Sequence, residues 1–171
     1  ASTGNPSIDM ISSNAQIQSG GVITMTGNIG EINTPNGVAS QAQFSGTNTI
    51  INGKLAPGQS PGQFIINGNL TMESDDTLEI EINDFNNAGT DFDQVQVNGM
   101  VNLTNATFTL VDQSGAFPQD NIIILTLIDN DGTDPIVGTF NGLPDGAMIA
   151  GNNGKNWNIF YNRGDGNDVI L

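Results

Sequence analysis

The feature that most constrains the fold is a set of Asn-Gly pairs set between short alternating apolar segments. Three copies share the pattern apolar, Asn, Gly, any residue, apolar: Ile51–Leu55, Ile66–Leu70 and Val97–Val101. Asn and Gly adopt positive φ at low cost, so the chain can bend at these positions without strain. Successive copies begin 15 and then 31 residues apart, which indicates an imperfect internal repeat.

Between the Asn-Gly pairs, apolar and polar residues alternate with the period of a β-strand. Leu78, Ile80 and Ile82 alternate with polar residues, and no window shows the apolar spacing of a helix. The sequence predicts an all-β single domain over residues 1–171, with a core that includes Leu78, Ile80, Val95, Val97, Phe108 and Leu110. Further strands are predicted at Val22–Thr26, Gln63–Ile66, Asp93–Val97, Ala106–Leu110, Ile136–Phe140, Asn156–Tyr161 and Asp168–Leu171, and one buried on both sides at Ile122–Ile128.

Two architectures fit this pattern. Asn-Gly hairpins between alternating strands would build an antiparallel β-sandwich. Irregular repeats of strand and corner also describe a β-solenoid, in which coils stack and Asn side chains hydrogen-bond to their equivalents in neighbouring coils. Periodicity alone does not separate the two.

Two segments carry a family resemblance over about residues 48–171. A corner at Pro57–Gly62 precedes the Asn-Gly strand, and Gly138–Gly146 leads to a closing strand at Gly164–Val169. Their order and spacing resemble the autotransporter passenger-type repeat region of bacterial surface and secreted proteins. The resemblance implies a right-handed parallel β-helix that is exported to the extracellular space or the bacterial cell surface.

The leading functional expectation is a non-enzymatic structural module of a surface fibre, stalk or extracellular matrix. Its partners would be copies of itself or the rest of a larger surface protein, joined end to end or by strand addition. No capping helix is visible at either end, so we expect unusual end strands or head-to-tail association. Residues 1–13 are predicted to hold an edge or exchanged strand, because Ser7–Ser12 is short and apolar at three positions.

Composition excludes several functions. The chain has 18 acidic residues, three basic residues (Lys54, Lys155 and Arg163), no His and no Cys, for a formal charge of −15. Disulfides, thiolate chemistry and His-based catalysis are therefore absent. Three cations argue against nucleic acid as a partner, and no apolar run approaches the ~20 residues that span a bilayer.

One candidate metal site stands out. Asp129, Asp131 and Asp134 surround Gly132 with oxygen ligands at the spacing that suits Ca²⁺. A solvated turn is the competing interpretation. The Gly164–Ile170 segment resembles one unit of a calcium-binding nonapeptide repeat, but one copy is more typical of a turn before the last strand.

Two other functions remain as alternatives. Trp157, Phe160 and Tyr161 could stack on sugars in a carbohydrate-binding adhesin domain, with glycans as partners, although their spacing favours the core. Carboxylates paired on strand faces, Glu79 with Glu81 and Asp91 with Asp93, could serve a polysaccharide-active enzyme. A solvated acidic face is the favoured interpretation of these pairs, and no catalytic residue or organic cofactor is predicted.

Overall fold

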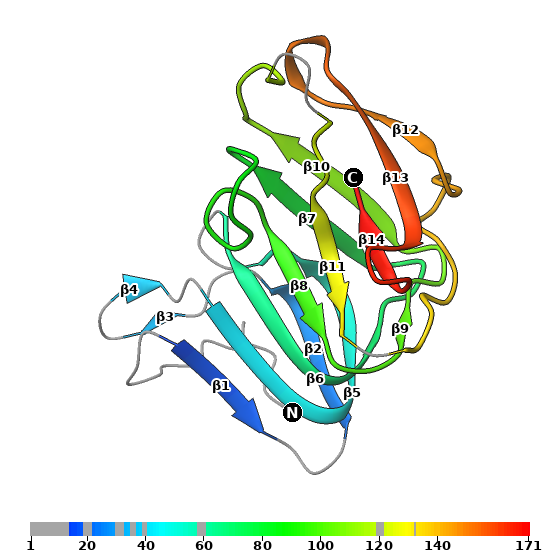
Figure 1. Cartoon of the computed structure of the whole chain (residues 1–171). Coiled ribbons are helices and arrows are strands. Elements are labelled where there is room, and N and C mark those ends of the chain that lie inside the picture. The colour runs from blue at the N-terminus through cyan, green and yellow to red at the C-terminus, as the bar shows by residue number, and fades with distance from the viewer. Residues whose placement is uncertain are drawn as a thin grey trace.

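The computed structural model describes residues 14–18, 22–29, 33–34, 37–38, 41–57, 61–118, 122–131 and 133–171 (Figure 1). The all-β class predicted from the sequence is confirmed. Within these ranges no helix is long and apolar enough to cross a membrane. The predicted edge strand in residues 1–13 lies outside the described residues.

Fourteen strands lie in the described ranges. Their bounds are β1 Asn14–Gln18, β2 Val22–Ile29, β3 Asn33–Thr34, β4 Gly37–Val38, β5 Gln41–Leu55, β6 Gln63–Thr71, β7 Thr77–Ile82, β8 Gln94–Val97, β9 Val101–Asn102, β10 Thr107–Asp112, β11 Thr126–Asn130, β12 Ala147–Ala150, β13 Asn156–Arg163 and β14 Asp168–Ile170. A short 3-10 turn at Asn152–Gly154 joins β12 to β13. Twelve of the strands belong to one sheet.

Parallel ladders organise the chain from β1 to β11. The long strand β5 pairs with β1 and β2 along one edge and with β6 and β7 along the other, and every pairing is parallel. The ladder continues from β6 to β8 and β9, from β8 to β11, and from β7 to β10. The register aligns Gln41 with Gln63 and Gln63 with Gln94. Segments separated in sequence by a strand and a corner therefore stack in register.

The last strands run differently. β14 pairs antiparallel with both β11 and β13, and β13 pairs antiparallel with β12. The predicted right-handed parallel β-helix is not confirmed, because the strand orientations are mixed. Figure 1 shows β12 and β13 at the end of the molecule opposite to β1. The sheet curls into a nearly closed, barrel-like form.

Stacked apolar side chains fill the interior. Phe64 aligns with Val95, and Val95 aligns with Ile128; all three are fully buried. The predicted core residues Leu78, Ile80, Val95 and Val97 are also fully buried, whereas Phe108 and Leu110 are partly buried against that core. Alternation along each strand explains this result, since only one face of the sheet turns inward.

Two predicted strands are wrong. Ile122 is 91% exposed and Ile124 is 63% exposed, so the strand buried on both sides that was predicted over Ile122–Ile128 begins only at Thr126. Ile136–Phe140 contributes only an isolated bridge at Val137. In both segments apolar composition predicted regular pairing. Val137 does bond to a neighbouring segment, through Val137 N to Val101 O (2.8 Å) and Leu103 N to Val137 O (2.9 Å), but this pairing does not extend into a strand.

The Asn-Gly pairs serve a different purpose from hairpin turns. Asn67-Gly68 lies inside β6, where the strand bends against the corner at Gly46 of β5. Gly68 has φ +135°, and a Cβ placed on it would lie 1.9 Å from the Gly46 carbonyl oxygen. A Cβ on Gly99 would lie 2.9 Å from the Gly68 carbonyl carbon. Glycine is required at this corner because three backbones stack in close contact.

Replacing Gly68 with alanine tests this close approach. We expect the free energy of unfolding to fall by at least about 2 kcal/mol, because the new methyl group meets backbone and the φ angle is strained. Urea denaturation measures the change. The matched control is Gly115→Ala, where nothing lies within 4 Å of the added Cβ; equal losses in the two variants would contradict the stacked corner.

Candidate functional site

Amide side chains form ladders along the outside of the stacked strands. The Asn98 side-chain amide donates to Asn67 Oδ1 (2.7 Å), and the Asn67 amide donates to Ser45 Oγ (3.0 Å). A second ladder joins Gln63 Nε2 to Gln94 Oε1 (2.8 Å). These contacts confirm the expected bonding between equivalent Asn residues, and they hold neighbouring strands in one register.

Buried carboxylates lie where the ladders bend. Asp76, 1% exposed, accepts hydrogen bonds from the backbone N–H groups of Gly53 and Glu73, both at 2.7 Å. Asp93, 3% exposed, accepts from Gly62 N and Glu81 N, also at 2.7 Å. Each aspartate supplies acceptors to two backbone donors from different segments of the chain. The solvated acidic face predicted for Asp93 is therefore wrong at this residue.

Burial gives Asp93 an unusual proton affinity. Removal from water raises the pKa of Asp93 to about 7. The two backbone N–H donors lower this pKa, and the charges of Glu81 and Glu79 raise it, but burial is the largest effect. An ionised carboxylate is costly in such surroundings unless it is fully hydrogen-bonded. Asp93 thus titrates in the neutral range.

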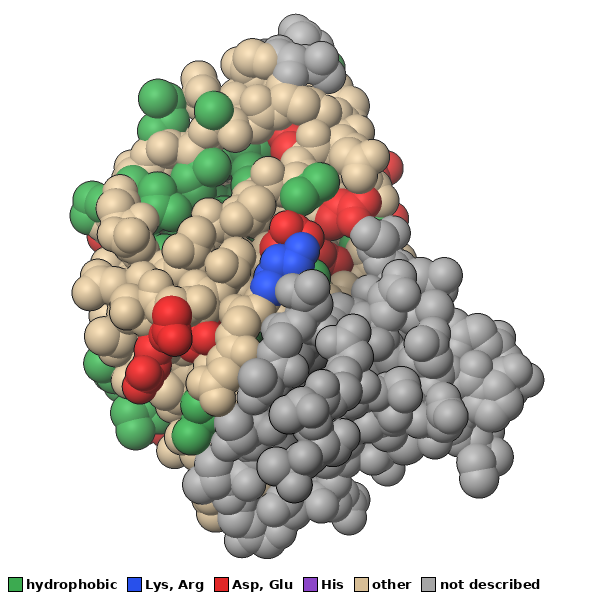
Figure 2. Space-filling model, turned by 180° about the vertical axis from the view of Figure 1, so that it is seen from behind, with side chains coloured by type: hydrophobic (Ala, Val, Ile, Leu, Met, Phe, Trp, Pro, Cys, Tyr) green, Lys and Arg blue, Asp and Glu red, His purple; other side chains and the backbone are tan. Residues whose placement is uncertain are grey.

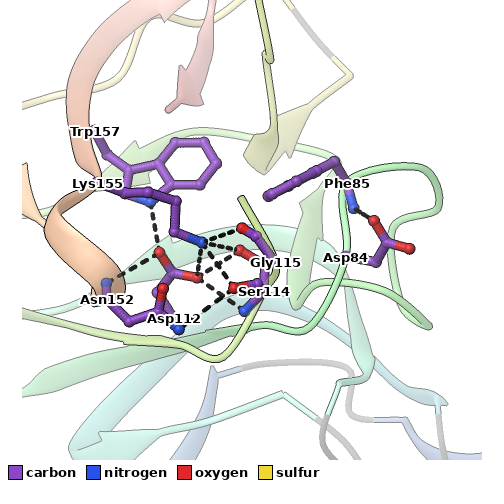
Figure 3. Close-up of polar contacts among 8 residues, drawn as sticks. All are labelled: Asp84, Phe85, Asp112, Ser114, Gly115, Asn152, Lys155 and Trp157. Carbon is purple, nitrogen blue, oxygen red and sulfur yellow. Dashed lines mark hydrogen bonds and ion pairs between the residues drawn. The ribbon is translucent and has the colours of Figure 1, made fainter. Parts of the chain in front are cut away.

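A buried ion pair joins the two ends of the curled sheet (Figure 3). Lys155 Nζ lies 3.0 Å from Asp112 Oδ1, and the two side chains are 5% and 1% exposed. The ammonium also donates to Ser114 O (3.0 Å), Ser114 Oγ and Gly115 O (2.8 Å). Asp112 ends β10 and Lys155 precedes β13, so this ion pair closes the gap between the two ends of the sheet.

Other groups complete the shell around Asp112. Trp157 Nε1 donates to Asp112 Oδ2 (3.0 Å), and Asn152 N donates to the same oxygen (3.3 Å). Burial opposes ionisation of Asp112, but hydrogen bonds from Ser114, Trp157 and Lys155 outweigh it and hold the pKa of this carboxyl below its usual value. The carboxylate is therefore charged and fully engaged at neutral pH.

Aromatic rings enclose the cation of this pair. Lys155 Nζ lies 5.5 Å from the centre of the Phe85 ring and 5.6 Å from that of Phe117. Phe117 packs edge-on against Trp157, with ring centres 4.9 Å apart. Desolvation by these rings strengthens the cation–π contacts and the ion pair together.

The predicted aromatic cluster divides between the two faces of β13. Trp157 and Tyr161 are 3% and 4% exposed, which confirms the core interpretation for both. The Tyr161 hydroxyl donates to Leu143 O (2.8 Å) and accepts from Phe140 N (3.1 Å), and burial raises the pKa of Tyr161 to about 12. Phe160 lies half-buried on the opposite face.

The two acidic turns predicted from the sequence come together. Asn130 N donates to Asp168 Oδ1 (3.0 Å), and this bond joins the Asp129–Asp134 segment to the turn before β14. Burial raises the pKa of Asp168, and the charges of Asp129 and Asp165 add to the effect. Asp129 Oδ2 accepts from Gln96 Nε2 (3.0 Å).

No group of three or more carboxylates suited to a metal ion occurs in the part of the chain that the structure describes. Calcium binding at Asp129, Asp131 and Asp134 stays a prediction. Glu79 and Glu81 point away from the core on β7, where Glu79 pairs with Lys54 (2.8 Å) and Glu81 accepts from Gln113 (2.8 Å). Figure 2 shows acidic side chains in separate groups on one face of the molecule.

Sequence reasoning missed the Asp112–Lys155 pair. The two residues are 43 positions apart, and neither belongs to a recognisable motif. The available signal was indirect: Lys155 is one of three cations in a very acidic chain and stands two residues before the only tryptophan. Neither fact identifies the partner.

Removing the cation tests the ion pair. We expect Lys155→Met to lower the free energy of unfolding by about 3–5 kcal/mol, because it leaves the Asp112 carboxylate buried without its countercharge. Lys54→Met, which breaks the more exposed Lys54–Glu79 pair, should cost less than about 1 kcal/mol. In urea denaturation, the double variant Asp112→Asn/Lys155→Met should lose less than the sum of its single variants; strictly additive losses would contradict coupling.

The Asp93 carboxyl predicts a pH dependence. Its pKa is 3.8 in a model peptide and about 7 in the folded chain, so between these values the folded state holds a proton that the unfolded state lacks. The free energy of unfolding should therefore fall as pH rises from about 4 to about 7. Asp93→Asn should flatten this slope, whereas the exposed control Asp75→Asn should retain it; an unchanged slope in Asp93→Asn would contradict the assignment.

Comparisons of the chain with family models, curated proteins and solved structures find no match. The resemblance to autotransporter passenger repeats therefore stays a prediction, and the function has to be argued from the geometry of this chain.

Proposed function

We propose that the protein is a non-enzymatic structural module, exported to the extracellular space or the bacterial cell surface, whose parallel ladders are coils of a right-handed β-solenoid. The observation that carries the proposal is the in-register parallel stack from β1 through β5, β6 and β8 to β11. Such a stack suits a stalk, fibre or matrix component, because it extends by adding like units.

The spacing between stacked residues supports the solenoid. Side-chain hydrogen bonds join residues 22 apart (Ser45 and Asn67), 31 apart (Gln63 and Gln94) and 33 apart (Gln96 and Asp129). Solenoid repeats fall between about 20 and 50 residues. Parallel strands joined by crossovers are right-handed in nearly all proteins, which supports the proposed hand.

The two ends of the stack differ in whether their outer strands are paired. This difference supports association at the end formed by β1 and β2. Among the described strands, β1 and β2 pair only with β5, so they present an edge that can accept another strand. At the other end the antiparallel strands β12, β13 and β14 follow β11, and the Asp112–Lys155 pair fastens them to β10. We infer that copies of the chain, or the rest of a larger surface protein, join at the β1 and β2 edge.

Electron microscopy of negatively stained protein tests this function. Fibres, or particles joined through one end, are the expected result, and deletion of residues 1–13 should abolish their formation. The controls are the full-length protein and the Lys54→Met variant. Isolated particles under all conditions would contradict association at this edge, and unchanged assembly after the deletion would contradict a part for residues 1–13 in it.

A chelator added to the same samples tests calcium. If Asp129, Asp131 and Asp134 bind the ion, chelation should disperse the assemblies, and Asp131→Asn should reproduce the effect. Unchanged assemblies after chelation would remove calcium from the proposal without affecting the solenoid.

A further inference from the structure

A groove of about 350 Å³ lies on the outer face of the C-terminal strands. Its floor includes Asn156, Asn158 and Phe160 of β13, and its wall includes Phe117 and the segment Ile122–Ile124. Asn156, Asn158 and Phe160 share one face of the strand because side chains alternate. The volume falls within the range of about 300–1,000 Å³ that small ligands occupy.

The groove differs in charge from the rest of the chain. The chain carries a formal charge of −15, yet none of the side chains that line the groove is charged. An anionic ligand would meet a repulsive field and no side-chain countercharge, and a cationic ligand would find no Asp or Glu side chain in the lining. The charge pattern therefore favours a neutral ligand.

The polar groups in the lining are amides placed beside aromatic rings. Asn158 Nδ2 donates to Gly146 O (3.1 Å), which fixes this side chain and leaves its carbonyl oxygen as an acceptor. Asn156 is exposed and makes no side-chain hydrogen bond to any described residue. An amide both donates and accepts, so the pair can bind hydroxyl groups.

Aromatic and aliphatic side chains supply the remaining surface. Phe117 lines one side of the groove and packs edge-on against the buried ring of Trp157, whose Nε1 donates to Asp112 in the ion-paired cluster. The Arg163 guanidinium lies 5.3 Å from the centre of the Phe160 ring and pairs with Asp145, which restrains that ring. Ile122 and Ile124 leave large apolar side chains in water at the rim.

We propose that this groove binds a neutral oligosaccharide. A pyranose ring presents C–H groups on one face, which pack on aromatic and aliphatic side chains, and hydroxyl groups at its edge, which pair with Asn156 and Asn158. A purely apolar ligand would leave the amides without hydrogen-bond partners. This proposal does not depend on the solenoid proposal.

The single tryptophan provides a direct measurement. Trp157 lines the groove and is the only tryptophan of the chain, so its fluorescence should change saturably when maltotriose, cellotriose or chitotriose is added. We expect at least one of these neutral sugars to bind and trigalacturonic acid not to bind. Asn156→Ala and Phe160→Ala should weaken the affinity at least tenfold.

The matched control is Asn52→Ala, an exposed asparagine of β5 outside the groove, which should bind as tightly as the unaltered protein. Circular dichroism verifies the fold of each variant. Because Asn156 is exposed, Asn156→Ala should remain folded and still test the groove if Phe160→Ala unfolds. The proposal is overturned if no neutral sugar binds at millimolar concentration, or if both groove variants bind the sugar normally. It is also overturned if trigalacturonic acid or an uncharged leucine-rich peptide binds in place of the neutral sugars. Dimerisation abolished by Phe160→Ala, without sugar binding, would assign the groove to a second copy.

Discussion

The bends of the stacked strands depend on acceptors for backbone N–H groups that lack a regular ladder partner. Buried carboxylates meet this need at Asp76 and Asp93, each of which receives two backbone donors. An unsatisfied buried donor costs about 1–3 kcal/mol, so each aspartate stabilises the fold by giving two such donors an acceptor. Some of the acidic residues of the chain therefore act as buried hydrogen-bond acceptors, while others lie on the surface.

The Asp112–Lys155 pair extends the same principle to the closing of the sheet. One carboxylate receives donors from Ser114, Lys155 and Trp157, while the rings of Phe85 and Phe117 keep water from the cation. The pair therefore positions Trp157, against which Phe117 packs at one side of the uncharged groove. The buried Asp112–Lys155 pair thus helps to determine the shape of the groove on the surface.

Local alternation predicted most of the strands, since Thr77–Ile82 and Gln94–Val97 follow the pattern of inward and outward residues. Alternation could not predict pairing direction, which depends on segments far apart in sequence. Ile122–Ile124 shows the limit: apolar composition predicted burial, but the side chains of Ile122 and Ile124 line the rim of a groove. The buried roles of Asp93 and Lys155 were equally hidden, because their partners are distant residues.

The long sequence separation of the ladder contacts has a consequence for how the chain folds. Contacts between residues 22 to 33 positions apart require the closure of large loops before they contribute stability. Proteins dominated by such contacts fold slowly. Lys155 gains its acceptors only when β10 is already in place, 43 residues earlier in the chain. The contact between Lys155 and Asp112 therefore adds stability only after the chain on both sides of that loop has been brought together.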